Sequence, residues 1–517
     1  MRPDARALAA LFLALAPGSV AAQDVVGPPR SAIPWLSDSL AAQDAPAPPP
    51  AAPVEPAATP LRDAEVATTP IGEARRDAVG LLPANVTGLP PDAFAGSDPA
   101  RLAELIARQP GDAMPAMQDL WLAILLAELD PPRAAADPDA LFFARVDGLL
   151  RFGALEQAQA LLERAGATDA EAFRRWWDAS LLTGFDDQAC AAMAANPGVA
   201  PTLPARIFCL SRQGDWAAAA LTLETGRVLG AITEDEDLLL SHFLDPELFE
   251  GEPPPGPPRP MTPLAFRLLD GIGETPPTRD LPLAFAAADL RPTTGWKAQI
   301  EAAERLVRVR ALDPNRLLAL YTERRPSASG GVWDRAAAIQ ALDTALQERD
   351  REAVARSLPA AFAAMRGAGL LVPFAALYGA ALGEAGLDGP AAELALHAGL
   401  LSPSYEAVAR KAAPAGPRDR FAVAVATGAV AEAVAAGAVP PGLLPGAVAR
   451  GLSEPPPDDL ARLAGEGRLG EALLEAQLML AGGAESDPRL IAEALAFLRA
   501  VGLVDTARRA ALQLLLL

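Results

Sequence analysis

A short unit, Gly-x-x-x-x-Ala, recurs along most of this chain, and its copies fall where a turn leads into an apolar, helix-periodic segment. Recurrence at a period of roughly 20–50 residues is typical of stacked supersecondary units. Glycine suits the left-handed turn that ends a helix, and a small alanine lets the next helix approach its neighbour closely. The unit therefore predicts an α-solenoid of stacked antiparallel helix pairs. Its copies are Gly153/Ala158, Gly184/Ala189, Gly214/Ala219, Gly386/Ala391, Gly428/Ala433, Gly467/Ala472 and Gly502/Ala507.

The composition favours the same all-α fold class. Hydrophobic residues make up 51% of the chain but aromatic residues only 5%, so the apolar interior must be built mainly from alanine and leucine. Alanine has the best helix propensity and little preference for strands. Alternating runs of β-branched and aromatic residues are almost absent. We expect a core of closely spaced helices.

The chain is strongly acidic, with a formal net charge of −21 at pH 7. Phosphate backbones and anionic lipids would repel such a chain, so nucleic-acid binding is not expected. The acidity either keeps an alanine-rich surface soluble or forms a patch for a basic partner.

Residues 1–22 have the pattern of a secretory signal peptide. Arg2 and Arg6 supply positive charge, a short apolar run follows from Ala7 to Ala16, and small residues lead up to Ala22. This run is far shorter than the roughly 20 residues that span a bilayer. We expect cleavage after Ala22, export to the periplasm as a soluble protein, and no membrane insertion after cleavage.

Residues 23–96 are rich in proline and alanine, and we expect a disordered tether because such a segment buries too little apolar surface to offset its ordering entropy. Two apolar islands interrupt it. The first, residues 31–40, is interpreted as a partner-binding motif anchored by Trp35, or as a strap that folds back onto the helices. For the second, residues 79–94, the strap is favoured. The candidate partner-binding residues of the first island are Ile33, Trp35, Leu36 and Leu40.

Helical periodicity begins after Ser97 and persists to the end of the chain, which predicts two blocks of helical repeats, 97–249 and 262–517. Between them lies the proline-rich segment 250–261, through which no helix can run. We therefore expect a hinge or loop there.

The chain contains two cysteines, Cys190 and Cys209, on either side of a proline-rich turn centred near residue 200. Antiparallel helices folded about that centre would bring the two Cα atoms within the 4.4–6.8 Å or so that a disulfide requires. Export makes oxidation feasible. We expect a structural disulfide, with two buried free thiols as the alternative; without a Cys-x-x-Cys motif, a redox-active pair is disfavoured.

Side chains that could carry chemistry are sparse. The two histidines, His242 and His397, are far apart, and we recognise no carboxylate or cysteine at metal spacing beside either, so no zinc site is expected. No metalloprotease, phosphate-binding or nucleophile-elbow motif occurs. The run Glu234 to Asp237 suggests helix capping rather than calcium binding. We expect no catalytic, metal-binding or cofactor-binding residues.

Trp176 and Trp177 are adjacent, so on a helix their side chains point about 100° apart. One of them is expected to pack between helices with Phe173, and the other is a candidate partner-binding residue in a groove.

Two segments resemble the tetratricopeptide family. Residues 214–219, Gly-Asp-Trp-Ala-Ala-Ala, are similar to that family's turn into its second helix, and residues 311–315, Ala-Leu-Asp-Pro-Asn, to its repeat-closing segment. The resemblance implies a divergent solenoid with a concave surface for proteins or peptides. The proline- and alanine-rich leader and residues 31–40 also resemble alphaproteobacterial exported proteins labelled as related to antifreeze glycopeptide, but the leader contains Ala-Ala-Thr only once, so this label follows from composition.

These patterns favour a non-catalytic periplasmic scaffold or adaptor that binds a protein or peptide partner of the cell envelope. The alternative is the helical superstructure of a peptidoglycan-processing system. Enzymes of that kind end in a lysozyme-like domain, whereas here helical repeats continue to Leu517.

Overall fold

The computed structural model describes residues 75–133, 139–166 and 168–517, and these belong to one unit, Ile71–Leu517. Within the described ranges every regular element is a helix, and the extended backbone pairs once, in an isolated parallel bridge between Leu82 and Ala127. The all-α prediction is thus confirmed. The predicted signal peptide and the first apolar island lie outside the described residues.

The first group of helices comprises η2 (Arg76–Ala78), α2 (Ala84–Thr87), α3 (Pro99–Arg108), α4 (Pro115–Leu126), α5 (Ala140–Arg151), α6 (Leu155–Ala165), α7 (Ala170–Thr183), α8 (Asp186–Ala195), η3 (Pro197–Val199), α9 (Leu203–Arg212), α10 (Trp216–Leu229) and α11 (Glu234–Leu244). After a long connection follow α12 (Pro263–Gly271), η4 (Thr278–Asp280), η5 (Leu283–Leu290), α13 (Trp296–Arg308), α14 (Pro314–Glu323), α15 (Val332–Gln347), α16 (Arg351–Gly367), α17 (Leu371–Glu384) and α18 (Gly389–Leu401). The last group is α19 (Tyr405–Lys411), α20 (Pro417–Thr427), α21 (Val430–Ala435), α22 (Leu443–Ser453), α23 (Asp458–Gly465), α24 (Leu469–Met479), η6 (Gly483–Glu485), α25 (Pro488–Ala500) and α26 (Val504–Leu516).

The recurring glycines have the backbone conformation that their spacing predicts. All seven have a positive φ, from 63° at Gly386 to 90° at Gly502. Side chains with a Cβ rarely adopt this conformation, so glycine ends the preceding helix at little cost. The partner alanines are buried except for Ala433, which is partly exposed. Each unit therefore combines a tight turn with a close helix–helix approach.

The acidic run at the start of α11 caps that helix. The Thr233 hydroxyl accepts a hydrogen bond from the Glu236 amide, and the Glu236 carboxylate accepts one from the Thr233 amide. This reciprocal pair is a capping box. The run also places negative charge at the positive end of the helix dipole. The structure thus supports the capping interpretation.

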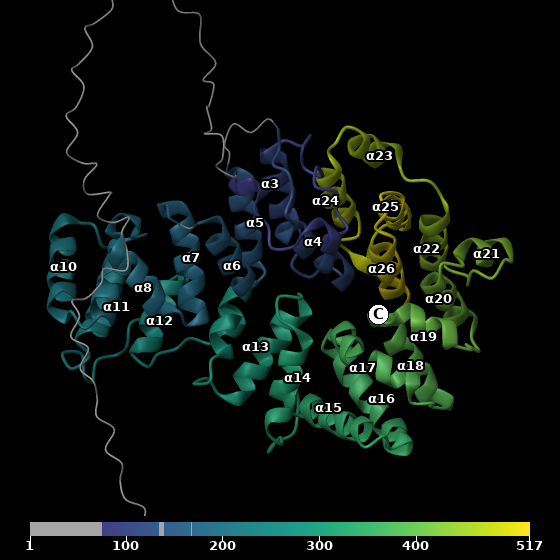
Figure 1. Ribbon diagram of the computed structural model, residues 1–517. Helices are drawn as coiled ribbons and strands as arrows, with labels where there is room; N and C mark the ends of the chain where they lie inside the picture. The colour runs from purple at the N-terminus through teal and green to yellow at the C-terminus, as the bar shows by residue number, and fades with distance from the viewer. Residues whose placement is uncertain (1–74, 134–138, 167) are drawn as a thin grey trace, which may run out of the picture. The chain divides into compact units, whose positions relative to one another are not determined.

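Helices that are adjacent in the chain pack against each other along most of its length (Figure 1). Extensive pairs are α9 with α10, α15 with α16, α17 with α18, and α25 with α26. A departure from this order is the packing of α22 on α25, which brings together helices separated by α23 and α24.

The last helices of the chain also pack against the first ones. α24 contacts α3, and α26 contacts α4 (Figure 1). The side-chain amide of Gln109 donates to the Leu474 carbonyl at 3.0 Å, and the Ala116 amide donates to the side-chain oxygen of Gln513 at 2.9 Å. The two ends of the helical array are therefore joined by polar as well as apolar contacts.

The second apolar island packs against the helices, as expected for a strap. Leu89 and Phe94 are buried, and the amides of Leu81 and Leu82 both donate to the carbonyl of Leu126. Residues 75–96 thus contain short helical and turn elements and contribute to the core, so the prediction of a disordered tether over residues 23–96 is wrong for this part.

The proline-rich segment 250–261 contains no helix, as predicted. It connects α11 to α12, and these two helices nevertheless pack against each other. Residues on both sides of the segment belong to the same unit.

None of the helices formed by the described residues is both long enough and apolar enough to cross a membrane.

Candidate functional site

The two cysteines form a disulfide between neighbouring helices. Cys190 of α8 and Cys209 of α9 have Cα atoms 5.0 Å apart, and both residues are buried. The pairing expected from the chain geometry is therefore present. Since both sulfurs are bonded and buried, this pair supports the fold rather than forming a reactive site.

The structure does not place either adjacent tryptophan in an open groove, which corrects the expectation of a partner-binding side chain there. Trp176 is 7% exposed and Trp177 is 2% exposed. Trp176 packs near Phe173, and its Nε1 donates to Glu163 at 3.1 Å. Trp177 packs edge-on against Phe208. Both are buried because α7 has helices on several sides: α6, α8 and α12 all pack against it.

The other candidate partner-binding residues, Ile33, Trp35, Leu36 and Leu40, lie outside the described residues.

Exposed apolar side chains are concentrated on α10, and we call Leu221, Val228 and Leu229 the α10 face. Their exposed fractions are 69%, 85% and 72%. Leu221 and Val228 are seven residues apart and therefore lie on one side of the helix, two turns from each other. Trp216, at the start of α10, is also half exposed. Sequence reasoning noted the aromatic side chain in this turn but missed the apolar face.

The opposite side of α10 packs normally against α9 and α11. Ala219, Leu223 and Gly226 are buried there, and the side chains of Leu203 and Ile232 lie against Gly226. An amphipathic surface helix usually presents polar residues on the side away from the core. α10 instead has apolar side chains on both sides, and nothing in the described part of the chain covers the outer one.

The surroundings of the α10 face are acidic. Glu224 lies on α10 itself, and Glu234 and Asp235 are exposed at the start of α11. Arg227 pairs with Glu224, and it also donates from Nε to Asp237 at 2.6 Å and from Nη2 to Ser241 at 2.8 Å. Among the described residues, Glu234 and Asp235 form no ion pair with a lysine or arginine, so they carry the negative charge here. An apolar surface with an acidic border favours ligands that carry apolar side chains beside positive charges.

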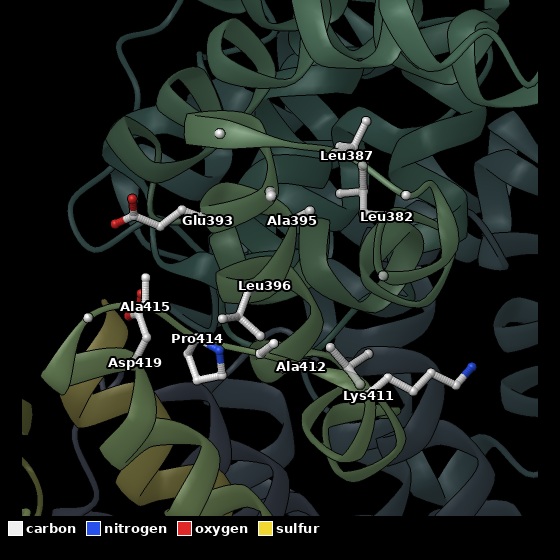
Figure 2. A pocket seen from close by; sticks show the side chains of 17 residues that line it. Leu382, Leu387, Glu393, Ala395, Leu396, Lys411, Ala412, Pro414, Ala415 and Asp419 are labelled. Carbon is white, nitrogen blue, oxygen red and sulfur yellow. The ribbon is translucent and has the colours of Figure 1, made fainter.

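A second feature is a cleft of about 570 Å³ formed by α17, α18, α19 and the segment leading to α20 (Figure 2). Its walls are largely apolar and include Leu382, Leu387 and Leu396. Glu393 and Asp419 lie together on one side of it, and Lys411 lies on the other (Figure 2).

His397 lies close to both of these carboxylates at the rim of the cleft. Its Nε2 lies 2.9 Å from Oδ1 of Asp419. One side-chain donor atom from each of Glu393, His397 and Asp419 can be chosen so that all three lie within 4.8 Å of one another. Glu393 stands four residues before His397, a spacing that places both side chains on one helix face. The expectation that no carboxylate stands at metal spacing beside either histidine is therefore wrong for His397. Asp419 comes from another helix, and no local spacing reveals it.

A further buried cluster lies between α13, α14 and α15. The Glu304 carboxylate accepts hydrogen bonds from the Tyr321 hydroxyl at 2.7 Å and from Nε of Arg335 at 2.8 Å. Burial and the neighbouring Glu304 charge raise the pKa of Tyr321 above its ordinary value. Hydrogen bonding to Glu304 raises the pKa of Arg335 above its ordinary value, so the guanidinium keeps its positive charge. The cluster opens onto none of the described cavities and holds helices together.

Comparison of the chain with protein-family models, with curated proteins and with solved structures finds no match.

Proposed function

We propose that this chain is a non-catalytic helical-repeat scaffold, exported to the periplasm, that binds a protein or peptide partner of the cell envelope. The observation that carries the proposal is the α10 face, where three large apolar side chains are exposed next to acidic groups. Exposed apolar side chains gathered in one place with a polar border are typical of protein-binding surfaces.

We also propose that the helices form a tetratricopeptide-like solenoid. A divergent tetratricopeptide-like solenoid is supported by the recurring glycine turns with positive φ and by the packing of helices that are adjacent in the chain. Arrays of stacked helix pairs generally provide extended surfaces for proteins and peptides.

The partner we propose is an amphipathic helix with leucine-like side chains flanked by lysine or arginine. Its apolar side would cover Leu221 and Val228, and its positive charges would lie near Glu234 and Asp235. Covering one such side chain fully contributes about 1.5–3 kcal/mol, and each 1.4 kcal/mol or so corresponds to a tenfold change in affinity.

The experiment uses the mature chain and a fluorescein-labelled synthetic helix of leucine and lysine, with binding followed by fluorescence anisotropy. We expect saturable binding that weakens at least about tenfold in the double variant Leu221→Gln/Val228→Gln. Leu443→Gln is the matched control, because Leu443 is 78% exposed but lies on α22. This control should bind like the wild type, and a peptide with glutamate in place of lysine should not bind.

Equal binding by the wild type and the double variant would reject the α10 face as the site. Sedimentation velocity distinguishes the competing occupant, a second copy of this chain. A dimer that dissociates in the double variant, without any binding of the basic peptide, would contradict the proposed partner.

Export is proposed from residues 1–22 and is tested separately. Expressed in a Gram-negative host, the chain should be recovered from the periplasmic fraction with Gln23 as its first residue. Replacing Ala22 by arginine should block cleavage, because a small residue is needed there. Recovery of the uncleaved wild-type chain in the cytoplasm would refute export.

A further inference from the structure

We propose that Glu393, His397 and Asp419 bind a transition-metal dication of the Zn²⁺ class. The site lies where α18 and α20 meet, at the rim of the cleft described above. This inference is independent of the proposed partner surface, because it concerns different helices and a different kind of ligand.

The three side chains converge because of their places on two helices. Glu393 and His397 are one turn apart on α18, so both face the same direction, toward α20. Asp419 is in the first turn of α20, which begins at Pro417. Figure 2 shows the Glu393 and Asp419 side chains on the same side of the cleft.

The distances are close to those of a bound ion. Zinc holds nitrogen and oxygen ligands at about 2.0–2.2 Å, so any two ligand atoms of one ion lie at most about 4.4 Å apart. His397 Nε2 and Asp419 Oδ1 already lie 2.9 Å apart, and all three donor atoms lie within 4.8 Å of one another. Glu393 is exposed, so rotation of its flexible side chain can close the remaining gap.

The electrostatics favour a cation at this point. Among the described residues, neither Glu393 nor Asp419 forms an ion pair with a lysine or arginine, and the contact of Asp419 with a basic side chain is the one with His397. The nearby cations are directed elsewhere: Lys411 lies 3.7 Å from Glu384, and Arg418 donates to the Leu515 carbonyl. A dication would neutralise the two carboxylates that these side chains leave unpaired.

The donor set selects the class of metal. Imidazole nitrogen suits zinc, iron, nickel and copper, whereas Mg²⁺ and Ca²⁺ prefer oxygen ligands throughout. Three protein ligands also leave at least one coordination position free, as in open zinc sites.

The experiment is isothermal titration calorimetry, in which Zn²⁺ is added to the metal-free full chain. We expect one site whose affinity falls about tenfold or more in Glu393→Gln and in Asp419→Asn, since loss of even an outer-shell partner commonly costs 10–100-fold or so. Glu393→Gln is the main variant because this exposed side chain can change without disturbing the core. Glu432→Gln is the matched control: it removes an exposed carboxylate of α21, outside the cleft, and should leave the affinity unchanged.

The melting temperature with and without Zn²⁺ is a second measurement, which tests the site even if Asp419→Asn proves unstable. Zn²⁺ should raise the melting temperature of the wild type and of Glu432→Gln but not that of Glu393→Gln. Absence of Zn²⁺ binding at micromolar concentrations would overturn the proposal, as would equal affinity in the wild type and Glu393→Gln. A preference for Ca²⁺ over Zn²⁺ would refute the assigned class of metal.

Discussion

The ring of Phe94 lies so close to the backbone of Gly470 that a Cβ atom built on this glycine would be 2.0 Å from Cε1 of Phe94. The Gly470 amide also donates to the Ala93 carbonyl at 2.8 Å. This contact joins the segment before α3 to the start of α24, so it holds together parts of the chain that are far apart in sequence. Gly470 is needed for its lack of a side chain, because the ring occupies the space that a Cβ would fill.

Gly470→Ala should therefore destabilise the protein, by about 1–3 kcal/mol, since overpacking forces the ring or the backbone to move. Urea denaturation followed by circular dichroism measures the change. Gly465→Ala in α23 is the matched control, because a Cβ there meets nothing within 4 Å. The control should be neutral or slightly stabilising. Equal stability of the two variants would show that Phe94 does not pack on Gly470 in solution.

The Cys190–Cys209 disulfide should contribute to stability through the loop that it closes. The two residues are separated by 19 positions, and a loop of this size removes about 3 kcal/mol of entropy from the unfolded chain. Reduction should lower the melting temperature of the wild type and leave that of Cys190→Ala/Cys209→Ala unchanged. A thiol count on the unfolded, unreduced protein should find no free thiol, and two free thiols would contradict the pairing.

Local chemistry made part of this fold predictable. A glycine before an apolar-periodic segment signals a left-handed helix end by itself, and the cysteines needed only one turn between them to be paired correctly. The acidic run after Thr233 likewise carries its capping box within four residues. The burial of both Trp176 and Trp177 was not predictable, because it requires α7 to be covered on several sides by helices that lie elsewhere in the chain.

The candidate sites show the same limit. Glu393 and His397 share a helix face, which their spacing reveals, but Asp419 joins them only because α18 and α20 lie close together. The α10 face was missed for a different reason. Its apolar residues look like ordinary core positions in the sequence, and only the arrangement of neighbouring helices leaves them uncovered.

Asp77 should make the stability of the protein depend on pH. Burial raises its pKa from 3.8 to about 6, although the Phe142 amide donates to its Oδ1 at 2.8 Å and Arg75 and Arg145 are nearby. Because the folded-state pKa lies above the unfolded one, the stabilising contribution is fully present below about pH 4. It is lost as the pH rises through about 6.

Asp77→Asn tests this dependence, since asparagine can still accept the Phe142 hydrogen bond but does not titrate. Between pH 4 and pH 7, the free energy of unfolding of the variant should rise by on the order of 2 kcal/mol relative to that of the wild type. Denaturant unfolding at several pH values measures the difference, and Asp112→Asn at an exposed position controls for the loss of one charge. A difference that stays constant over this range would rule out a raised pKa for Asp77.

The Glu304 cluster should behave as a buried ion pair whose partners depend on each other. Glu304 is nearly fully buried, and it accepts hydrogen bonds from both Tyr321 and Arg335. Glu304→Leu removes the acceptor for both and leaves a partly buried guanidinium without its counter-ion, so a loss of about 3–5 kcal/mol is expected. Tyr321→Phe removes a single hydrogen bond to a charged group and should cost about 1.5–3 kcal/mol.

The double variant Glu304→Leu/Arg335→Leu should be more stable than Glu304→Leu alone, because replacing both ions by apolar groups leaves no unpaired charge. Denaturant unfolding of the wild type, Glu304→Leu, Arg335→Leu and the double variant completes a double-mutant cycle and measures the coupling between Glu304 and Arg335. Additive losses would mean that the two side chains do not interact in solution, and the helices α13 and α15 would then be held together by their apolar contacts alone.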